Sequence, residues 1–225
     1  MVTDKHISDI KLICFDMDGT IYTSEGILLP SYHTGIDSFN AKYNMNLAKP
    51  SLEELEHQIG QPVRIIFQNL FPELTGDERL QELSKLVLDF FLKEISNKGG
   101  RLFPDVYSTL EQLKGRGYSL AIASNGRKEY LKEILNAFNL EHFFLPLVAI
   151  DEQEITEKAH ILQNYMSVHS VSSEEILMIG DRSSDLEASE KIQCPFIGCS
   201  YGFASNEIEK AEIIVTNIKQ ILDYI

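Results

Sequence analysis

The stretch Leu12-Ile13-Cys14-Phe15-Asp16-Met17-Asp18-Gly19-Thr20 decides the fold of this chain. It begins with an unbroken apolar run, which is typical of a strand covered on both faces in a parallel sheet. Residues two apart in an extended segment point to the same side, so Asp16, Asp18 and Thr20 are expected to face one space. Gly19 allows the backbone to turn sharply there. Ligands of parallel sheets bind at this carboxyl edge, and a solvated acidic turn is the alternative interpretation.

Elsewhere, short apolar runs alternate with helical patterns. Leu131, Ile134, Leu135 and Phe138 recur at helical spacing, and Asp105 is a candidate N-cap for an earlier helix. Alternation of strand and helix predicts an α/β fold with a doubly wound, Rossmann-like and mostly parallel sheet. The further runs predicted to be strands are Tyr118 to Ala123, Leu147 to Ile150, Ile176 to Ile179, Pro195 to Gly198 and Ile213 to Val215.

The segment between the first strand and residue 98 shows only helical patterns. Ser51 and Glu54 have the spacing of a capping box, and Val63, Ile66, Phe67 and Leu70 follow at helical spacing. We therefore expect an all-helical insertion over residues 22–97 and an α/β core formed by residues 1–21 and 98–225. Glycines at the two joins, Gly26, Gly99 and Gly100, permit the backbone angles of a hinge.

Charge and composition exclude several classes of protein. The 225 residues include 20 Lys and Arg against 34 Asp and Glu, a net charge of −14 that repels nucleic acid and anionic lipid. A membrane span needs roughly 20 consecutive apolar residues, and no such stretch occurs. The first residues lack the apolar core of a signal peptide, so we expect a cytoplasmic protein. Cys14, Cys194 and Cys199 form no CxxC pair and are interpreted as small buried hydrophobes.

Other polar motifs also follow predicted strands. Ser124-Asn125-Gly126 follows one strand and is expected to open a helix, where a hydroxyl and free N–H groups can bind an anion or simply cap the helix. Arg127 and Lys128 come next, and solvated surface charge is the simpler interpretation of both, with a substrate contact as the alternative. Lys158 stands just before a further helical pattern and alone indicates nothing.

Gly180-Asp181-Arg182-Ser183-Ser184-Asp185 follows the run that ends at Ile179. Asp181 and Asp185 are expected to face the same centre as Asp16 and Asp18, where the carboxylates would repel one another without a cation. Mg²⁺ prefers hard oxygen ligands and bridges to phosphate. Mg²⁺ and Lys158 together would balance the aspartates and leave Ser124 for a phosphoryl group.

This ordered set resembles the haloacid dehalogenase-like hydrolases, which share a strand-borne DxDGT, then Ser or Thr, then Lys, then GDxxxD. The resemblance covers essentially the whole chain, including Tyr201-Gly202-Phe203 near its end. The position of the helical insertion resembles the cap of the branch that contains phosphoglycolate phosphatases and β-phosphoglucomutase. The chain departs from many relatives in reading Tyr22-Thr23-Ser24 after DGT and Lys158-Ala159-His160 in place of Lys-Pro.

The resemblance implies a role for each motif residue. Asp16 resembles the nucleophile that forms an aspartyl-phosphate, and Asp18 the general acid/base. Ser124 and Lys158 resemble the phosphoryl-binding pair, to which we add Thr20 and Asn125. Asp181 resembles the ligand that shares Mg²⁺ with Asp16 and the backbone carbonyl of Asp18, with Asp185 in support.

We therefore predict an Mg²⁺-dependent phosphatase for a small soluble phosphate monoester. A phosphomutase of the β-phosphoglucomutase type is the alternative, and a non-catalytic phosphate-binding protein is a further one. The expected partner is a small phosphorylated metabolite, with neither nucleic acid nor membrane; the sequence does not indicate protein partners. The carboxylate at Asp18 argues against dehalogenation, because relatives that displace halide lack an acid there.

Overall fold

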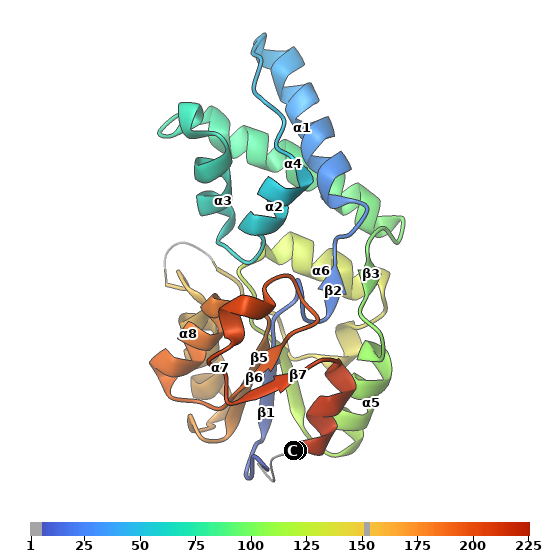
Figure 1. Ribbon diagram of the computed structural model, residues 1–225, viewed down its shortest axis with the longest axis vertical. Coiled ribbons are helices and arrows are strands. Elements are labelled where there is room, and N and C mark those ends of the chain that lie inside the picture. The colour runs from blue at the N-terminus through green and yellow to red at the C-terminus, as the bar shows by residue number, and fades with distance from the viewer. Residues whose placement is uncertain (1–5, 151–153) are drawn as a thin grey trace.

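The computed structural model describes residues 6–150 and 154–225. The expectation about a signal peptide concerns the first residues of the chain, and residues 1–5 lie outside the described part. The predicted α/β fold is confirmed: β1 lies inside a five-stranded, wholly parallel sheet of order β4-β1-β5-β6-β7 (Figure 1). Chain order changes direction across β1, because β4 pairs with one of its edges and β5 with the other. The strands are β1 (Leu12–Phe15), β4 (Ser119–Ile122), β5 (Ile176–Gly180), β6 (Phe196–Cys199) and β7 (Ile213–Val215).

Helices cover both faces of the sheet, which explains the unbroken apolar runs. Ile13 and Phe15 pack in one hydrophobic cluster with α5 (Val106–Gly115) and α6 (Lys128–Ala137). Leu12 and Cys14 point the other way, into a second cluster with α7 (Lys158–His169) and α8 (Ser183–Ile192). Short 3₁₀ helices η2 (Glu141–Phe143), η3 (Ser205–Ile208) and η4 (Ile218–Asp223) complete this part of the chain.

The helical region stands above the carboxyl edge of the sheet (Figure 1). It contains α1 (Leu28–Tyr43), α2 (Leu52–Gln58), α3 (Val63–Leu70), η1 (Pro72–Leu74) and α4 (Arg79–Ser96). The predicted capping box starts α2, since Glu54 N donates to Ser51 Oγ and Ser51 N donates to Glu54 Oε2. A short antiparallel ribbon of β2 (Tyr22–Thr23) and β3 (Arg101–Leu102) connects the helices to the sheet. The domain boundaries at residues 21 and 98 stay a prediction.

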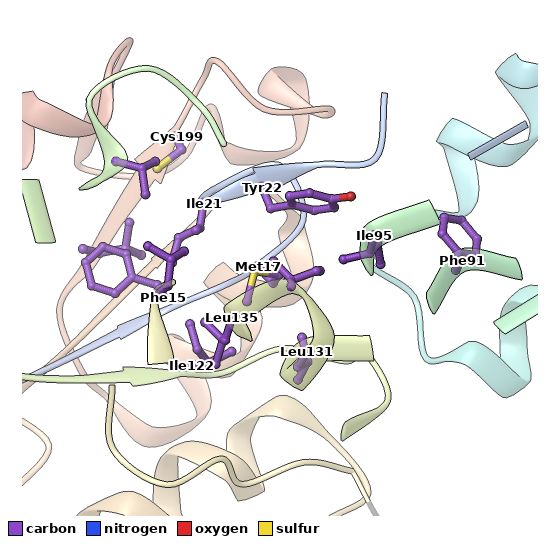
Figure 2. Packing of buried hydrophobic residues seen from close by; sticks show 14 of the residues in the cluster. Phe15, Met17, Ile21, Tyr22, Phe91, Ile95, Ile122, Leu131, Leu135 and Cys199 are labelled. Atoms are coloured by element: carbon purple, nitrogen blue, oxygen red, sulfur yellow. The ribbon is translucent and has the colours of Figure 1, made fainter. Parts of the chain in front are cut away.

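Apolar packing is continuous from the sheet into the helical region. Met17 and Tyr22, just after β1, lie in the same cluster as Phe91 and Ile95 of α4 (Figure 2). Helix α4 also packs on α6, where the rings of Phe91 and Tyr130 meet edge to face with centroids 5.9 Å apart. Buried apolar side chains therefore hold the helical region against the α/β part of the chain.

Three local expectations were wrong. Leu147–Ile150 forms no strand: the segment before it meets β4 at an isolated bridge between Phe144 and Leu120, and Val148 N then donates to Tyr165 Oη instead of to a strand. Asp105 occupies the N-cap position of α5, but its side chain caps nothing because its backbone is left-handed, with φ 64°. The helix after Ser124 begins only at Lys128, so Ser124 lies in a loop before it.

None of the described helices is long and apolar enough to cross a membrane.

A pair of glycines tests the packing of α1 on α4. A Cβ on Gly35 would lie 2.6 Å from Val87 Cγ2 and 3.0 Å from the Val87 backbone, whereas a Cβ on Gly115 meets nothing within 4 Å. Gly35→Ala should lower the free energy of unfolding by about 1–3 kcal/mol through overpacking. Gly115→Ala should raise it by about 0.5–1 kcal/mol through helix propensity. Urea unfolding measures both, and a stabilised Gly35→Ala variant would contradict the close packing.

Candidate active site

The predicted motifs meet at the carboxyl edge of three neighbouring strands. Asp16 directly follows β1, Ser124 comes shortly after β4, and Asp181 directly follows β5. Because β1 lies between β4 and β5, these side chains come from adjacent strand ends. The order of the sheet, which no local pattern specifies, brings together residues far apart in the sequence.

Three of the predicted aspartates form a buried cluster. Carboxylate oxygens of Asp16, Asp181 and Asp185 all lie within 4.8 Å of one another, and all three residues are buried. Asp185 reaches the cluster from the first turn of α8, where its Oδ2 accepts a hydrogen bond from Arg182 N at 3.0 Å. The Asp18 carboxylate is not a member of this cluster.

Glycines allow the carboxylates to approach the backbone so closely. A Cβ on Gly19 would lie 2.1 Å from Asp181 Oδ2, and one on Gly202 would lie 2.4 Å from the same oxygen. A Cβ on Gly180 would lie 2.2 Å from Asp185. Gly202 belongs to the late Tyr-Gly-Phe segment, and its contact with Asp181 could not be inferred from spacing, because residues 181 and 202 are joined by a long connection.

Lys158 is the buried cation of the cluster. Its Nζ lies 3.1 Å from Asp16 Oδ1 and also donates to Asp185 Oδ1. Burial alone lowers the pKa of Lys158, but the carboxylates of Asp16 and Asp185 outweigh burial and hold that pKa above its usual value. Lys158 therefore stays charged and binds two of the three clustered carboxylates.

One cation leaves this cluster with excess negative charge. Burial, followed by repulsion from Asp185 and Asp16, holds the pKa of Asp181 well above its usual value. Burial also raises the pKa of Asp185, in spite of Lys158 beside it. The raised pKa values of both carboxyl groups indicate that their ionised forms lack sufficient positive charge nearby.

The residues present fit a divalent metal ion. Asp181 Oδ2 accepts a hydrogen bond from Phe203 N at 2.7 Å, while Asp181 Oδ1 is buried without a partner among the described residues. An orphaned carboxylate oxygen beside Asp16 offers the hard donors that Mg²⁺ prefers. Both oxygens of Asp185 already accept hydrogen bonds, from Lys158 and Arg182 N, which suits support of the site more than direct ligation.

Asp18 faces a different partner. Tyr130 Oη, from the first turn of α6, donates a 2.7 Å hydrogen bond to Asp18 Oδ1. Burial raises the pKa of Asp18 to about 7, although the hydrogen bond from Tyr130 lowers it in part. The sequence analysis did not identify Tyr130. The signal that could have found it is its position in the first turn of the helix that follows Ser124.

The predicted phosphate-binding residues are not all placed alike. Ser124 and Asn125 line the same cavity as Asp16 and Asp18. Asn125 Nδ2 donates to Gly60 O at 2.8 Å, and its buried Oδ1 has no partner among the described residues. Thr20 is fully buried and lies outside the lining of that cavity, and its hydroxyl likewise lacks a partner within the described part of the chain.

The loop after α2 closes the cavity from above. Ile59, Gly60 and Gln61 line it together with Asp16 and the other motif residues. Arg182 Nη2 donates to Ile59 O and, at 3.1 Å, to Glu56 O, while Nη1 binds Glu207 at 2.7 Å. Arg182 stands next to Asp181, and sequence reasoning gave it no role. Asn125 and Arg182, each a member of one of the motifs, thus hold the loop of the helical region over the site.

Comparison with known proteins agrees with this geometry. The haloacid dehalogenase-like hydrolase family matches residues 13–199 of the chain. The chain belongs to this family. It is 29% identical over 205 residues to a phosphoglycolate phosphatase of Aliivibrio fischeri, with 88% of each chain covered. It is also 29% identical to one of Haemophilus influenzae, covering 88% of this chain and 89% of the relative.

A solved structure shows the same architecture. The crystal structure of a predicted phosphoglycolate phosphatase from Haemophilus somnus superimposes with a TM-score of 0.83 at 25% identity. The match covers 96% of this chain and 98% of that one. As a haloacid dehalogenase-like hydrolase, this protein is an enzyme, and its buried aspartates form the candidate metal site of a hydrolase.

The raised pKa values predict how stability depends on pH and metal. A carboxyl with a raised folded-state pKa retains protons that the unfolded chain has released, so the metal-free protein should lose stability as pH rises from about 4 to about 7. Mg²⁺ binds ionised carboxylates, so it should raise Tm more at about pH 8 than at about pH 5. Thermal unfolding with MgCl₂ or EDTA measures this. Asp181→Asn should remove most of the Mg²⁺ effect, and an equal Mg²⁺ effect at both pH values would contradict the site.

Proposed function

We propose that this protein is an Mg²⁺-dependent phosphatase that hydrolyses a small phosphate monoester through an aspartyl-phosphate on Asp16. One observation carries the proposal: Asp16 contacts the buried Lys158 and belongs to the carboxylate cluster, and it also lines a cavity together with Asp18. Such an arrangement places a nucleophile, charge stabilisation and a proton donor around a single phosphoryl position.

In the first step, a carboxylate oxygen of Asp16 attacks phosphorus and the bond from phosphorus to the leaving oxygen breaks. Lys158, 3.1 Å from Asp16 Oδ1, offsets the charge of the transferring group. Ser124 is proposed to donate its hydroxyl to a phosphoryl oxygen, with Asn125 and Thr20 as further candidates. Asp16 and Asp181, with the backbone carbonyl of Asp18 that the family resemblance adds, would hold Mg²⁺, which would supply the positive charge that lets two anions approach each other.

Asp18 transfers the proton in both steps. Because Tyr130 donates to Oδ1, the other carboxyl oxygen is available to carry the proton to the leaving group. The ionised Asp18 then takes a proton from water, whose oxygen attacks phosphorus and releases Asp16 and phosphate. A pKa of about 7 suits a group that must act first as an acid and then as a base near neutral pH.

The size of the cavity and the helical region above it support a small substrate. The cavity has a volume of about 110 Å³, below the range of about 300–1,000 Å³ typical of drug-sized ligands. Residues 22–97 are proposed to act as a cap that opens for exchange and closes to exclude water. A folded phosphoprotein or a polynucleotide would not fit beneath it. Phosphoglycolate, on which the named relatives act, is the first substrate to test, and the cytoplasmic location stays a prediction.

The nucleophile is tested by Asp16→Asn. This variant should show only background phosphate release, because an amide cannot form the aspartyl-phosphate. Asp9→Asn, an exposed change near the opposite end of β1, is the matched control and should retain activity. EDTA should abolish activity and Mg²⁺ should restore it. Activity in Asp16→Asn would overturn the proposal, and phosphoryl transfer without phosphate release would indicate the phosphomutase.

The proton-transfer role is tested by Asp18→Asn with two leaving groups. General acid catalysis contributes about 10²–10⁴-fold, and an alkoxide leaving group requires the proton far more than p-nitrophenolate does. In single-turnover phosphorylation, the variant should therefore lose at least about 10²-fold with an alkyl phosphate and much less with p-nitrophenyl phosphate. Equal losses with the two substrates would assign Asp18 another role.

A further inference from the structure

The wall of the active-site cavity is mostly apolar and contains one cation. Ile66, Phe67, Val87 and Phe91 are among the apolar side chains that line it. The charged residues in the lining are Asp16 and Asp18, already assigned to the chemistry, and Arg127. A guanidinium in such a wall is costly unless an anion compensates it.

Arg127 has no carboxylate partner among the described residues. Its Nη2 donates to the neutral Ser84 Oγ of α4 at 2.7 Å, the one hydrogen bond of its side chain found in this part of the chain. The other arginines that are not exposed differ: Arg79 binds Asp77, and Arg182 binds Glu207. In a protein with net charge −14, a half-buried arginine left without an acidic partner is an exception.

The backbone around Arg127 also favours an anion. Arg127 is the N-cap residue of the ten-residue helix α6, whose free N–H groups and dipole attract negative charge and disfavour a cation. The interpretation of Arg127 as a solvated surface charge was therefore wrong, because the structure places it on the cavity wall. The same interpretation holds for Lys128, which is exposed and lies outside this lining.

We propose that Arg127 binds a carboxylate of the substrate, so that the substrate class is small phosphorylated carboxylic acids. The proposal rests on the proposed function, with the phosphoryl group at Asp16 and the leaving group toward Arg127. A guanidinium pairs well with carboxylate or phosphate. A carboxylate fits better here, because its single charge matches one cation, whereas a second phosphate dianion would leave net charge inside a small apolar cavity.

The test compares two substrates that differ mainly in the carboxylate. Phosphoglycolate and ethyl phosphate share the phosphoryl group and a two-carbon leaving group. The ratio of their kcat/KM values should favour phosphoglycolate in the wild-type enzyme and should fall about 10- to 100-fold in Arg127→Met, as expected for loss of a charge-assisted hydrogen bond. Lys128→Met removes the same charge one residue away and should leave the ratio unchanged.

Each outcome distinguishes the substrate class from the proposed function. If the wild-type enzyme with Mg²⁺ hydrolyses neither substrate nor p-nitrophenyl phosphate, the phosphatase itself is refuted. If it hydrolyses them but Arg127→Met lowers both kcat/KM values equally, or if Lys128→Met changes the ratio as much, the carboxylate site is refuted and the phosphatase stands. Arg127→Gln, which keeps a donor for Ser84, should reproduce the fall in the ratio if Arg127→Met does not fold.

Discussion

Mutual repulsion among buried carboxylates is the constraint on which this site depends. Asp16, Asp181 and Asp185 are confined within 4.8 Å of one another, and Lys158 is the cation found in contact with two of them. Burial and repulsion raise the pKa of Asp181, so the cluster in its ionised form needs more positive charge. The same imbalance that makes the cluster unfavourable alone makes it suited to a divalent cation.

The fold maintains this unfavourable cluster through its rigid parts. Each aspartate follows a buried strand or begins a helix, and glycines at 19, 180 and 202 leave room that any side chain would fill. The hydrophobic clusters on the two faces of the sheet stabilise the strands that carry the charges. Apolar burial thus offsets the electrostatic cost at the carboxyl edge.

Contacts between the sheet and the helical region involve residues beside the chemistry. Tyr130 donates to Asp18 and packs on Phe91 of α4, while Arg182 and Asn125 hold carbonyls of the loop after α2. Tyr130, which binds Asp18, and Arg182, which follows Asp181, therefore also contact the helical region. A change in the position of these helices would alter the surroundings of Asp18 directly.

The sequence alone determined the α/β class and the residues of each motif, because unbroken apolar runs and carboxylates after strands are local patterns. It also predicted the capping box of α2. Tertiary structure decided the rest: Tyr130 as partner of Asp18, the close contact of Gly202 with Asp181, and Arg127 on the cavity wall. The strand expected at Leu147–Ile150 does not form either, because Val148 N donates its hydrogen bond to Tyr165 Oη. Such contacts join residues that are distant along the chain, so their partners depend on strand order and packing, which local periodicity does not encode.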